Sequence, residues 1–215
     1  MGQAIAASIE QQADFDLAGI WSRDGNLDEI VALADVVIDF SLPEGTEQVL
    51  DAVVSYSKPL VCGVSGLNDA QMTTLENAAR VVPVLYDRNM SLGVAVLERV
   101  LREAVAALGP GFDVEISETH HVHKKDAPSG TALKLGEAAA EARGDSDTSA
   151  IRYEVERRGE VPGDHEITLR SPTEALRLAH SVTTRQVFAD GALRAARWLV
   201  NREAGLYSMA DVLFD

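Results

Sequence analysis

Apolar residues follow two different spacings in the first ninety residues, and these spacings alternate along the chain. Short apolar runs typical of buried strands are separated by segments with helical spacing, such as Val49 and Val53 after Pro43. The patterns predict strands over 16–21, 34–40, 59–64 and 81–86, and helices over 1–12, 44–56 and 68–80. Strands that alternate with helices predict a parallel, doubly wound sheet whose ligands bind at the carboxyl ends of the strands.

The middle of the chain has a different pattern. One long apolar helix face is expected over 91–108, and Gly109-Pro-Gly111 ends that helix. Alternating apolar and polar residues then predict strands over 112–117, 151–157, 166–170 and 175–182, with helices over 132–143 and 185–201. The mixture predicts an α+β region.

Composition restricts the class of protein. Apolar residues make up 46% and charged residues 25% of the chain, as in ordinary globular proteins. The net charge of −15 argues against nucleic acid and anionic membranes as partners. No apolar stretch approaches the length of a membrane span, so we expect a cytoplasmic protein. Cys62, the single cysteine, lies in an apolar run and is expected to be buried and unreactive.

The segment from Thr119 to Thr131 carries the strongest chemical signal. Three histidines and two lysines lie within residues 120–125 of this acidic chain, and an anionic ligand would offset their repulsion. The following residues predict a helix start with Ser129 or Thr131 as N-cap. The amides near Gly130 would favour carboxylate or phosphate. The segment therefore predicts an anion-binding catalytic site.

The same histidines and lysines also allow less specific interpretations. Exposed histidines and lysine pairs are usually only solvated. His121 and His123 could share a metal ion, but no further His or Cys lies nearby and the lysines would repel a cation. We therefore expect no metal. The glycines at 63–66 and the polar segment 87–90 are weak signals alone, because most glycines after strands only form turns.

Residues 118–132 resemble the signature of the bacterial dihydrodipicolinate reductase family, roughly E-x-H-H-x-x-K-x-D-A-P-S-G-T-A, at every fixed position. Further similar stretches follow in family order, at 37–41, 43–46, 63–66, 89–93, 161–163, 188–193 and 198–199. The resemblance thus extends over nearly the whole chain. It implies a Rossmann-like nucleotide domain over 1–91 and 187–215, and a substrate and oligomerisation domain over 92–186.

The resemblance also implies residue roles. His120 is expected to donate or accept the proton, with Lys124 as a second proton donor. His121 is expected to bind one substrate carboxylate, and the amides of Gly130 and Thr131 the other. The expected contacts of NADPH or NADH are Arg23, Gly63, Val64, Ser65, Asp87, Arg88, Asn89 and Met90. The implied reaction reduces a cyclic dicarboxylate of lysine and diaminopimelate biosynthesis.

Three departures from the family pattern give further expectations. Met1-Gly2 matches only the end of the family's phosphate loop, so we expect the first strand to be missing, dinucleotide binding to be weak and the chain alone to be unstable. Ser22-Arg23 replaces an acidic residue and favours NADPH. The stretch after Gly163 is short, so strands of the substrate domain are expected to be missing, which leaves the family's homotetramer open.

Two alternatives from other classes remain at this point. One is a metal-dependent hydrolase or lyase that uses the histidine cluster. The other is a non-catalytic protein that keeps the anion site but has lost the cofactor site.

Overall fold

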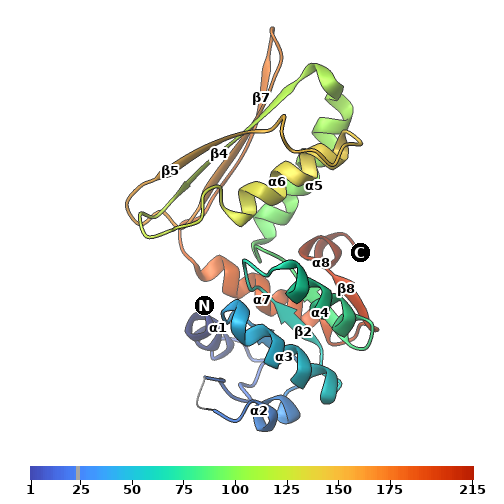
Figure 1. Cartoon of the computed structure of the whole chain (residues 1–215). Helices are drawn as coiled ribbons and strands as arrows, with labels where there is room; N and C mark the ends of the chain where they lie inside the picture. Colours follow the sequence, from blue (N-terminus) through green and yellow to red (C-terminus); the bar gives the residue numbers. More distant parts are fainter. Residues whose placement is uncertain (23–24) are drawn as a thin grey trace. The chain divides into compact units, whose positions relative to one another are not determined.

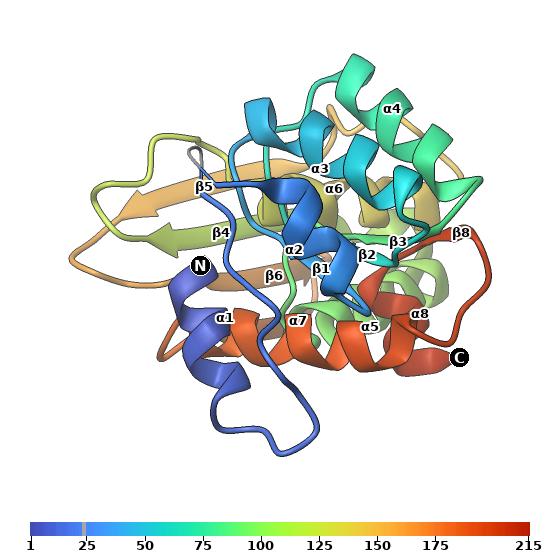
Figure 2. The same ribbon diagram turned by 90° about the horizontal axis from the view of Figure 1, so that it is seen from below.

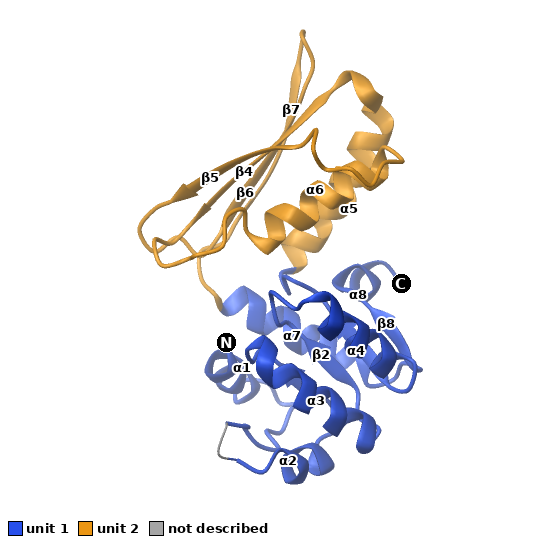
Figure 3. Ribbon diagram, in the orientation of Figure 1, with its two compact units in different colours: residues 1–91, 186–215 blue, residues 92–185 orange. Residues whose placement is uncertain are grey.

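The computed structural model describes residues 1–22 and 25–215, which form two compact units (Figure 3). Unit 1 comprises residues 1–91 and 186–215, and unit 2 comprises residues 92–185. Within the described residues, the helices are all too short or too polar to cross a membrane.

Unit 1 is built on a four-stranded parallel sheet (Figure 1). Its strand order is β1 (Val37–Asp39), β2 (Leu60–Cys62), β3 (Pro83–Tyr86) and β8 (Gly205–Tyr207). The helices of the unit are α1 (Gly2–Ile9), α2 (Leu27–Leu33), α3 (Pro43–Ser55), α4 (Asp69–Ala79), α7 (Gln186–Leu199) and α8 (Met209–Phe214). The predicted parallel, Rossmann-like sheet is confirmed.

Local sequence explains where these elements begin. Pro43 stands at the first position of α3, where its missing N–H costs nothing. Asn68 caps α4 in a reciprocal capping box with Gln71. Cys62 is fully buried in β2, and burial raises the pKa of its thiol to about 12, as expected for an unreactive cysteine.

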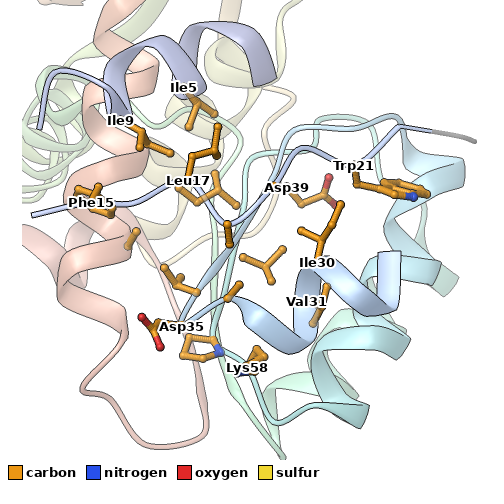
Figure 4. Close-up of a pocket in the computed structure, with 18 of the residues that line it drawn as sticks. Ile5, Ile9, Phe15, Leu17, Trp21, Ile30, Val31, Asp35, Asp39 and Lys58 are labelled. Carbon is orange, nitrogen blue, oxygen red and sulfur yellow. The ribbon is translucent and has the colours of Figure 1, made fainter. Parts of the chain in front are cut away.

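The strand expected over residues 16–21 was wrong. These residues are irregular, although their apolar pattern is that of a strand. A cavity of about 1240 Å³, called the edge cavity below, is lined both by this segment and by β1 (Figure 4). In the described part of the chain, strand β1 is hydrogen-bonded only to β2, so its other edge is free, and Leu17–Trp21 does not pair with that edge.

Helix α1 lies beside α7, at the other side of the edge cavity (Figures 2 and 4). The side chain of Gln186 in α7 contacts the buried Ser8 in α1, and Arg197 forms an ion pair with Asp14. The predicted helix over 1–12 is therefore confirmed in the shorter form Gly2–Ile9.

Unit 2 combines a mixed four-stranded sheet with two long helices (Figure 1). The strand order is β5 (Arg152–Arg157), β4 (Asp113–His120), β6 (Asp164–Arg170) and β7 (Ala175–Ser181), with β4 parallel to β5 and antiparallel to β6. Helices α5 (Leu92–Leu108) and α6 (Gly130–Ala142) pack against one face of this sheet, and a short 3-10 turn follows α5 over Gly109–Gly111.

Alternation in β4 determines which side chains face the helices. Val114 and Ile116 are fully buried in the core with α5 and α6. Residues 118 and 120 follow them on the same face, because successive side chains of a strand point to opposite sides. The end of β4 therefore directs a glutamate and a histidine toward the helix-covered side of the sheet.

Candidate active site

Five polar residues gather on the helix-covered face at the end of β4, and we call them the polar cluster: Glu118, His120, Ser129, Arg157 and His165. All but Arg157 are buried, with exposed fractions of 1–7%. They come from β4, the start of α6, β5 and β6. Their burial makes this a preorganised polar site rather than a solvated surface.

Glu118 lies at the centre of the polar cluster. Its Oε2 is 2.8 Å from His120 Nδ1, and its Oε1 accepts from the Ser129 backbone N–H at 3.0 Å. Arg157 donates to the same Oε1 at 3.1 Å. The ring of His165 stands edge-on to that of His120, with centroids 5.2 Å apart.

The charge state of the polar cluster follows from these contacts. Burial by itself raises the pKa of Glu118, but its contacts with His120, Ser129 and Arg157 outweigh burial and lower the pKa to about 2. Burial, together with the neighbouring His120, lowers the pKa of His165 to about 4, against an opposing effect of Glu118. At neutral pH, Glu118 is therefore ionised and His165 is neutral.

Arg157 joins the polar cluster to the loop that carries Lys124. Besides Glu118, its guanidinium donates to the backbone carbonyls of Lys124 and Asp126. The Lys124 ammonium lies 2.8 Å from the Asp126 carboxylate. Burial raises the pKa of Asp126, but its contacts with Lys124 lower it overall. His120 and Lys124, the two predicted proton donors, thus lie around one Glu118–Arg157 pair.

The predicted helix start is present and is capped as expected. Ser129 is the N-cap of α6, and its hydroxyl accepts from the Ala132 N–H at 3.2 Å. Gly130 and Thr131 are the first two residues of the helix, where the backbone amides form its positive end. Since Ser129 also donates to Glu118, the helix start is fixed to the polar cluster.

His121 and His123 lie beyond β4 and outside the polar cluster. Their rings are 6.0 Å apart, and His123 is exposed beside Glu160. Desolvation, with the charge of Arg185, lowers the pKa of His121, which favours a neutral ring.

Among the described residues, the side chains of Glu118, His120 and His165 lie close enough together to hold a metal ion. The Arg157 guanidinium already forms an ion pair with the Glu118 carboxylate and would repel a cation there. The trio is therefore better suited to hydrogen bonding than to a metal.

The predicted cofactor residues follow neighbouring parallel strands of unit 1. Residues 63–66 come after β2 and residues 87–90 after β3, and Cys62 pairs with Tyr86 at the ends of these strands. We call these segments the cofactor loops. An added side chain at Gly63 would meet the Phe40 ring at 2.5 Å, so the lack of a side chain allows the ring that follows β1 to pack against the loop after β2.

Several residues of the cofactor loops also have structural contacts. Val64 and Met90 are 1% exposed, so both residues are held in the core of unit 1. The Asp87 carboxylate accepts from the backbone N–H groups of Asn89 and of Met209 in α8. The predicted contact Arg23 lies outside the described residues.

Sequence reasoning did not assign Glu118, Arg157 or His165 to the site. Glu118 could have been found, because it precedes His120 by two residues on an alternating strand. Arg157 and His165 come from β5 and β6, and their proximity depends on a strand register that the sequence does not reveal.

The chain combines a Rossmann-like unit, with loops at the ends of its parallel strands, and a mixed-sheet unit that contains a buried histidine site. This combination defines the class of NAD(P)-dependent oxidoreductases with a separate substrate domain. Residues 1–90 match the family model "Dihydrodipicolinate reductase, N-terminus", and residues 93–213 match "Dihydrodipicolinate reductase, C-terminus". The chain belongs to the dihydrodipicolinate reductase family.

Curated relatives agree with this assignment. The chain is 45% identical to the 4-hydroxy-tetrahydrodipicolinate reductase of Sulfurimonas denitrificans, with 99% of this chain and 94% of the relative aligned. It is 39% identical to the enzyme of that name from Zymomonas mobilis, over 99% and 92% of the two chains. These alignments span 242 and 236 positions, so the relatives carry segments without a counterpart in this chain of 215 residues.

Solved structures support the fold. A dipicolinate-bound dihydrodipicolinate reductase from Paenisporosarcina sp. TG-14 superposes with a TM-score of 0.79 at 22% identity, covering 99% of this chain and 95% of that one. An engineered D-amino acid dehydrogenase bound to NADP+ superposes with a TM-score of 0.55 at 14% identity, over 97% and 90% of the chains. The family match favours an NAD(P)H-dependent oxidoreductase over the metal-dependent hydrolase and the non-catalytic alternative.

Proposed function

We propose that this protein reduces 4-hydroxy-tetrahydrodipicolinate to tetrahydrodipicolinate with NAD(P)H, in lysine and diaminopimelate biosynthesis. The observation that carries the proposal is the gathering of the signature residues His120 and Lys124 around the ion pair of the buried Glu118 with Arg157. The curated relatives that span nearly the whole chain bear the name of this activity.

The substrate is a cyclic dicarboxylate, and the residues of unit 2 supply matching groups. His120 is proposed to hold and deliver a proton, since an imidazole ring can both donate and accept one. Lys124, which now pairs with Asp126, would exchange that partner for a substrate carboxylate and act as a second proton donor. His121 would bind one carboxylate, and the amides of Gly130 and Thr131 would bind the other.

The cofactor loops of unit 1 are proposed to bind the nicotinamide cofactor. When bound, NAD(P)H supplies the hydride of the reduction. Gly63, Val64 and Ser65 would contact it through the close-lying backbone after β2. Asp87, Arg88, Asn89 and Met90 would line the neighbouring loop after β3. We expect NADPH to be preferred, on the basis of Arg23.

We also propose a homo-oligomer in the cytoplasm. The face of the unit 2 sheet opposite α5 and α6 carries charged pairs such as Glu115–Arg152 and Glu166–Arg177. A second copy could pair with such a surface through complementary charges. Light scattering after size exclusion would give the number of copies directly.

The proposal is tested by following the oxidation of NADPH and NADH with freshly generated 4-hydroxy-tetrahydrodipicolinate. Consumption of cofactor that depends on this substrate is expected. Lys124→Ala should lower kcat and raise KM together, because a charge partner of the dianion is removed. Lys125→Ala is the matched control and should change either constant less than about twofold. Absence of substrate-dependent oxidation by the unmodified chain would overturn the proposal.

A further inference from the structure

Glu118 is the one carboxylate buried in the polar cluster, and its two oxygens have different partners. Oε1 accepts from the Ser129 N–H and from Arg157, at 3.0 and 3.1 Å. Oε2 faces His120 Nδ1 at 2.8 Å. The arrangement leaves one carboxylate oxygen for the imidazole while the other is held by the scaffold.

The contact between Oε2 and Nδ1 is exclusive. Both atoms are buried and, among the described residues, neither forms a hydrogen bond of good geometry, so each is the nearest polar partner available to the other; the next atom near Oε2 is His165 Nε2, at 3.9 Å. An ionised carboxylate can only accept, so the proton of a neutral His120 ring belongs on Nδ1. The other tautomer would set the Nδ1 lone pair against the carboxylate oxygen and leave that buried oxygen without a donor, which costs about 1–3 kcal/mol and disfavours it.

The opposite ring nitrogen of His120 faces Gly163. An added side chain at Gly163 would come within 2.9 Å of His120 Nε2, so the lack of a Cβ there leaves room beside this nitrogen. The edge-on ring of His165, at 5.2 Å, limits rotation of the His120 ring. The ring therefore has one nitrogen close to the Glu118 carboxylate and the other facing Gly163.

We propose that Glu118 is a positioning residue that fixes the Nδ1–H tautomer and the ring orientation of His120, so that Nε2 is the atom that gives up and regains the proton. The inference rests on the proposed function, because it assigns an atom to the proton step of that reaction. A protonated His120 loses its Nε2 proton to the substrate and retains the Nδ1 proton toward Glu118. The ring then regains the Nε2 proton from water before the next turnover.

The first test needs no variant and no substrate. Nitrogen-15 NMR of the imidazoles in the unmodified chain should show neutral His120 with its proton on Nδ1, the signal being assigned by its loss in His120→Gln. A predominant Nε2–H tautomer would overturn the inference, even if the chain is an active reductase. Conversely, an inactive chain with the Nδ1–H tautomer would contradict the proposed function but not the positioning by Glu118.

The second test compares Glu118→Gln with Glu115→Gln, a matched change three residues earlier on β4 at the charged face of the sheet. Glu118→Gln should lower kcat by roughly 10²-fold with KM changed less than about threefold, and should increase the Nε2–H tautomer. Glu115→Gln should leave kcat and the His120 tautomer unchanged. A Glu118→Gln protein that keeps both the tautomer and kcat would contradict the inference. If that protein does not fold, the unmodified-chain measurement still decides.

Discussion

The polar cluster of unit 2 and the edge cavity of unit 1 each contain a buried carboxylate, but the two carboxylates have different numbers of close partners. In the polar cluster, both oxygens of Glu118 lie within 3.1 Å of a donor from the protein. In the edge cavity, Asp39 is 5% exposed, yet its Oδ2 has no hydrogen-bond partner among the described residues. Glu118 is therefore surrounded by more donors than Asp39, which ends β1, the edge strand of the unit 1 sheet.

Hydrogen exchange should give the largest difference between these two regions. Strand β1 has three residues and one neighbouring strand, and it lines the edge cavity. Strand β4 has eight residues between two neighbours. Amides of Val37–Asp39 should exchange roughly 10³-fold faster than those of Val114–Ser117, because local opening at the edge exposes little apolar surface. Equal protection of the β1 and β4 amides from exchange would contradict the expected difference in local stability between the two strands.

Acid should destabilise unit 2 through His165. Its pKa is lowered from 6.5 to about 4, so below pH 6.5 the unfolded chain binds a proton that the folded protein does not. The resulting stability is fully present above pH 6.5 and is lost as the pH falls toward 4. Between about pH 7 and about pH 5, the unfolding free energy of the unmodified chain should fall by about 2 kcal/mol more than that of His165→Gln.

Chemical unfolding followed by circular dichroism at the two pH values measures this difference. His123→Gln is the control, because His123 is exposed beside Glu160 and should leave the pH dependence intact. Glu118, with its pKa lowered from 4.5 to about 2, adds a further loss of stability only below pH 4.5. An unchanged pH dependence in His165→Gln would show that this ring does not titrate as its burial indicates.

A methyl group at residue 163 should disturb the position of the His120 ring in the polar cluster and thereby lower kcat. Gly163→Ala places the new Cβ 2.9 Å from His120 Nε2 and should lower kcat roughly tenfold by displacing the ring. Gly159→Ala is the matched control, since Gly159 also has a positive φ, of 51°, but its Cβ would meet nothing within 4 Å. Melting curves should show the larger destabilisation in Gly163→Ala, because only its Cβ meets another residue, and steady-state kinetics should show a loss of kcat in that variant alone. Equal kcat values would contradict the contact.

A side chain at the start of α6 should have the smallest effect. Gly130→Val is expected to raise the substrate KM about fivefold, because a branched side chain hinders the approach of a carboxylate to the helix amides. The affinity for NADPH, measured by calorimetry, should stay the same. A loss of NADPH affinity instead would assign this helix start to the cofactor site.

Much of the fold followed from periodicity alone. The apolar spacing of 44–56 and of 91–108 gave helices within a residue or two of α3 and α5. Three short elements, α2, β8 and α8, were not predicted, because three to seven residues carry too little periodicity to stand out. The segment 16–21 was predicted as a strand from its pattern, but a strand also needs a partner.

The site was predictable where its residues are close in the sequence. His120, Lys124 and the start of α6 lie within twelve residues, and local chemistry was enough to suggest an anion site. The partners that hold His120 are more distant, since Arg157 and His165 reach it through the pairing of β4 with β5 and β6. Register across strands is set by the whole sheet, which no local pattern contains.

Transfer of an isotopic label tests the central claim most directly. The unmodified chain, His120→Gln and His123→Gln would each be mixed with the substrate and with NADPH deuterated at its hydride position, and the product analysed by mass spectrometry. One deuterium is expected in the tetrahydrodipicolinate. The unmodified chain and His123→Gln should form this product at equal rates, and His120→Gln should form it roughly 10²–10⁴-fold more slowly. An unlabelled product, or a His120→Gln rate within about threefold of the unmodified chain, would contradict this account.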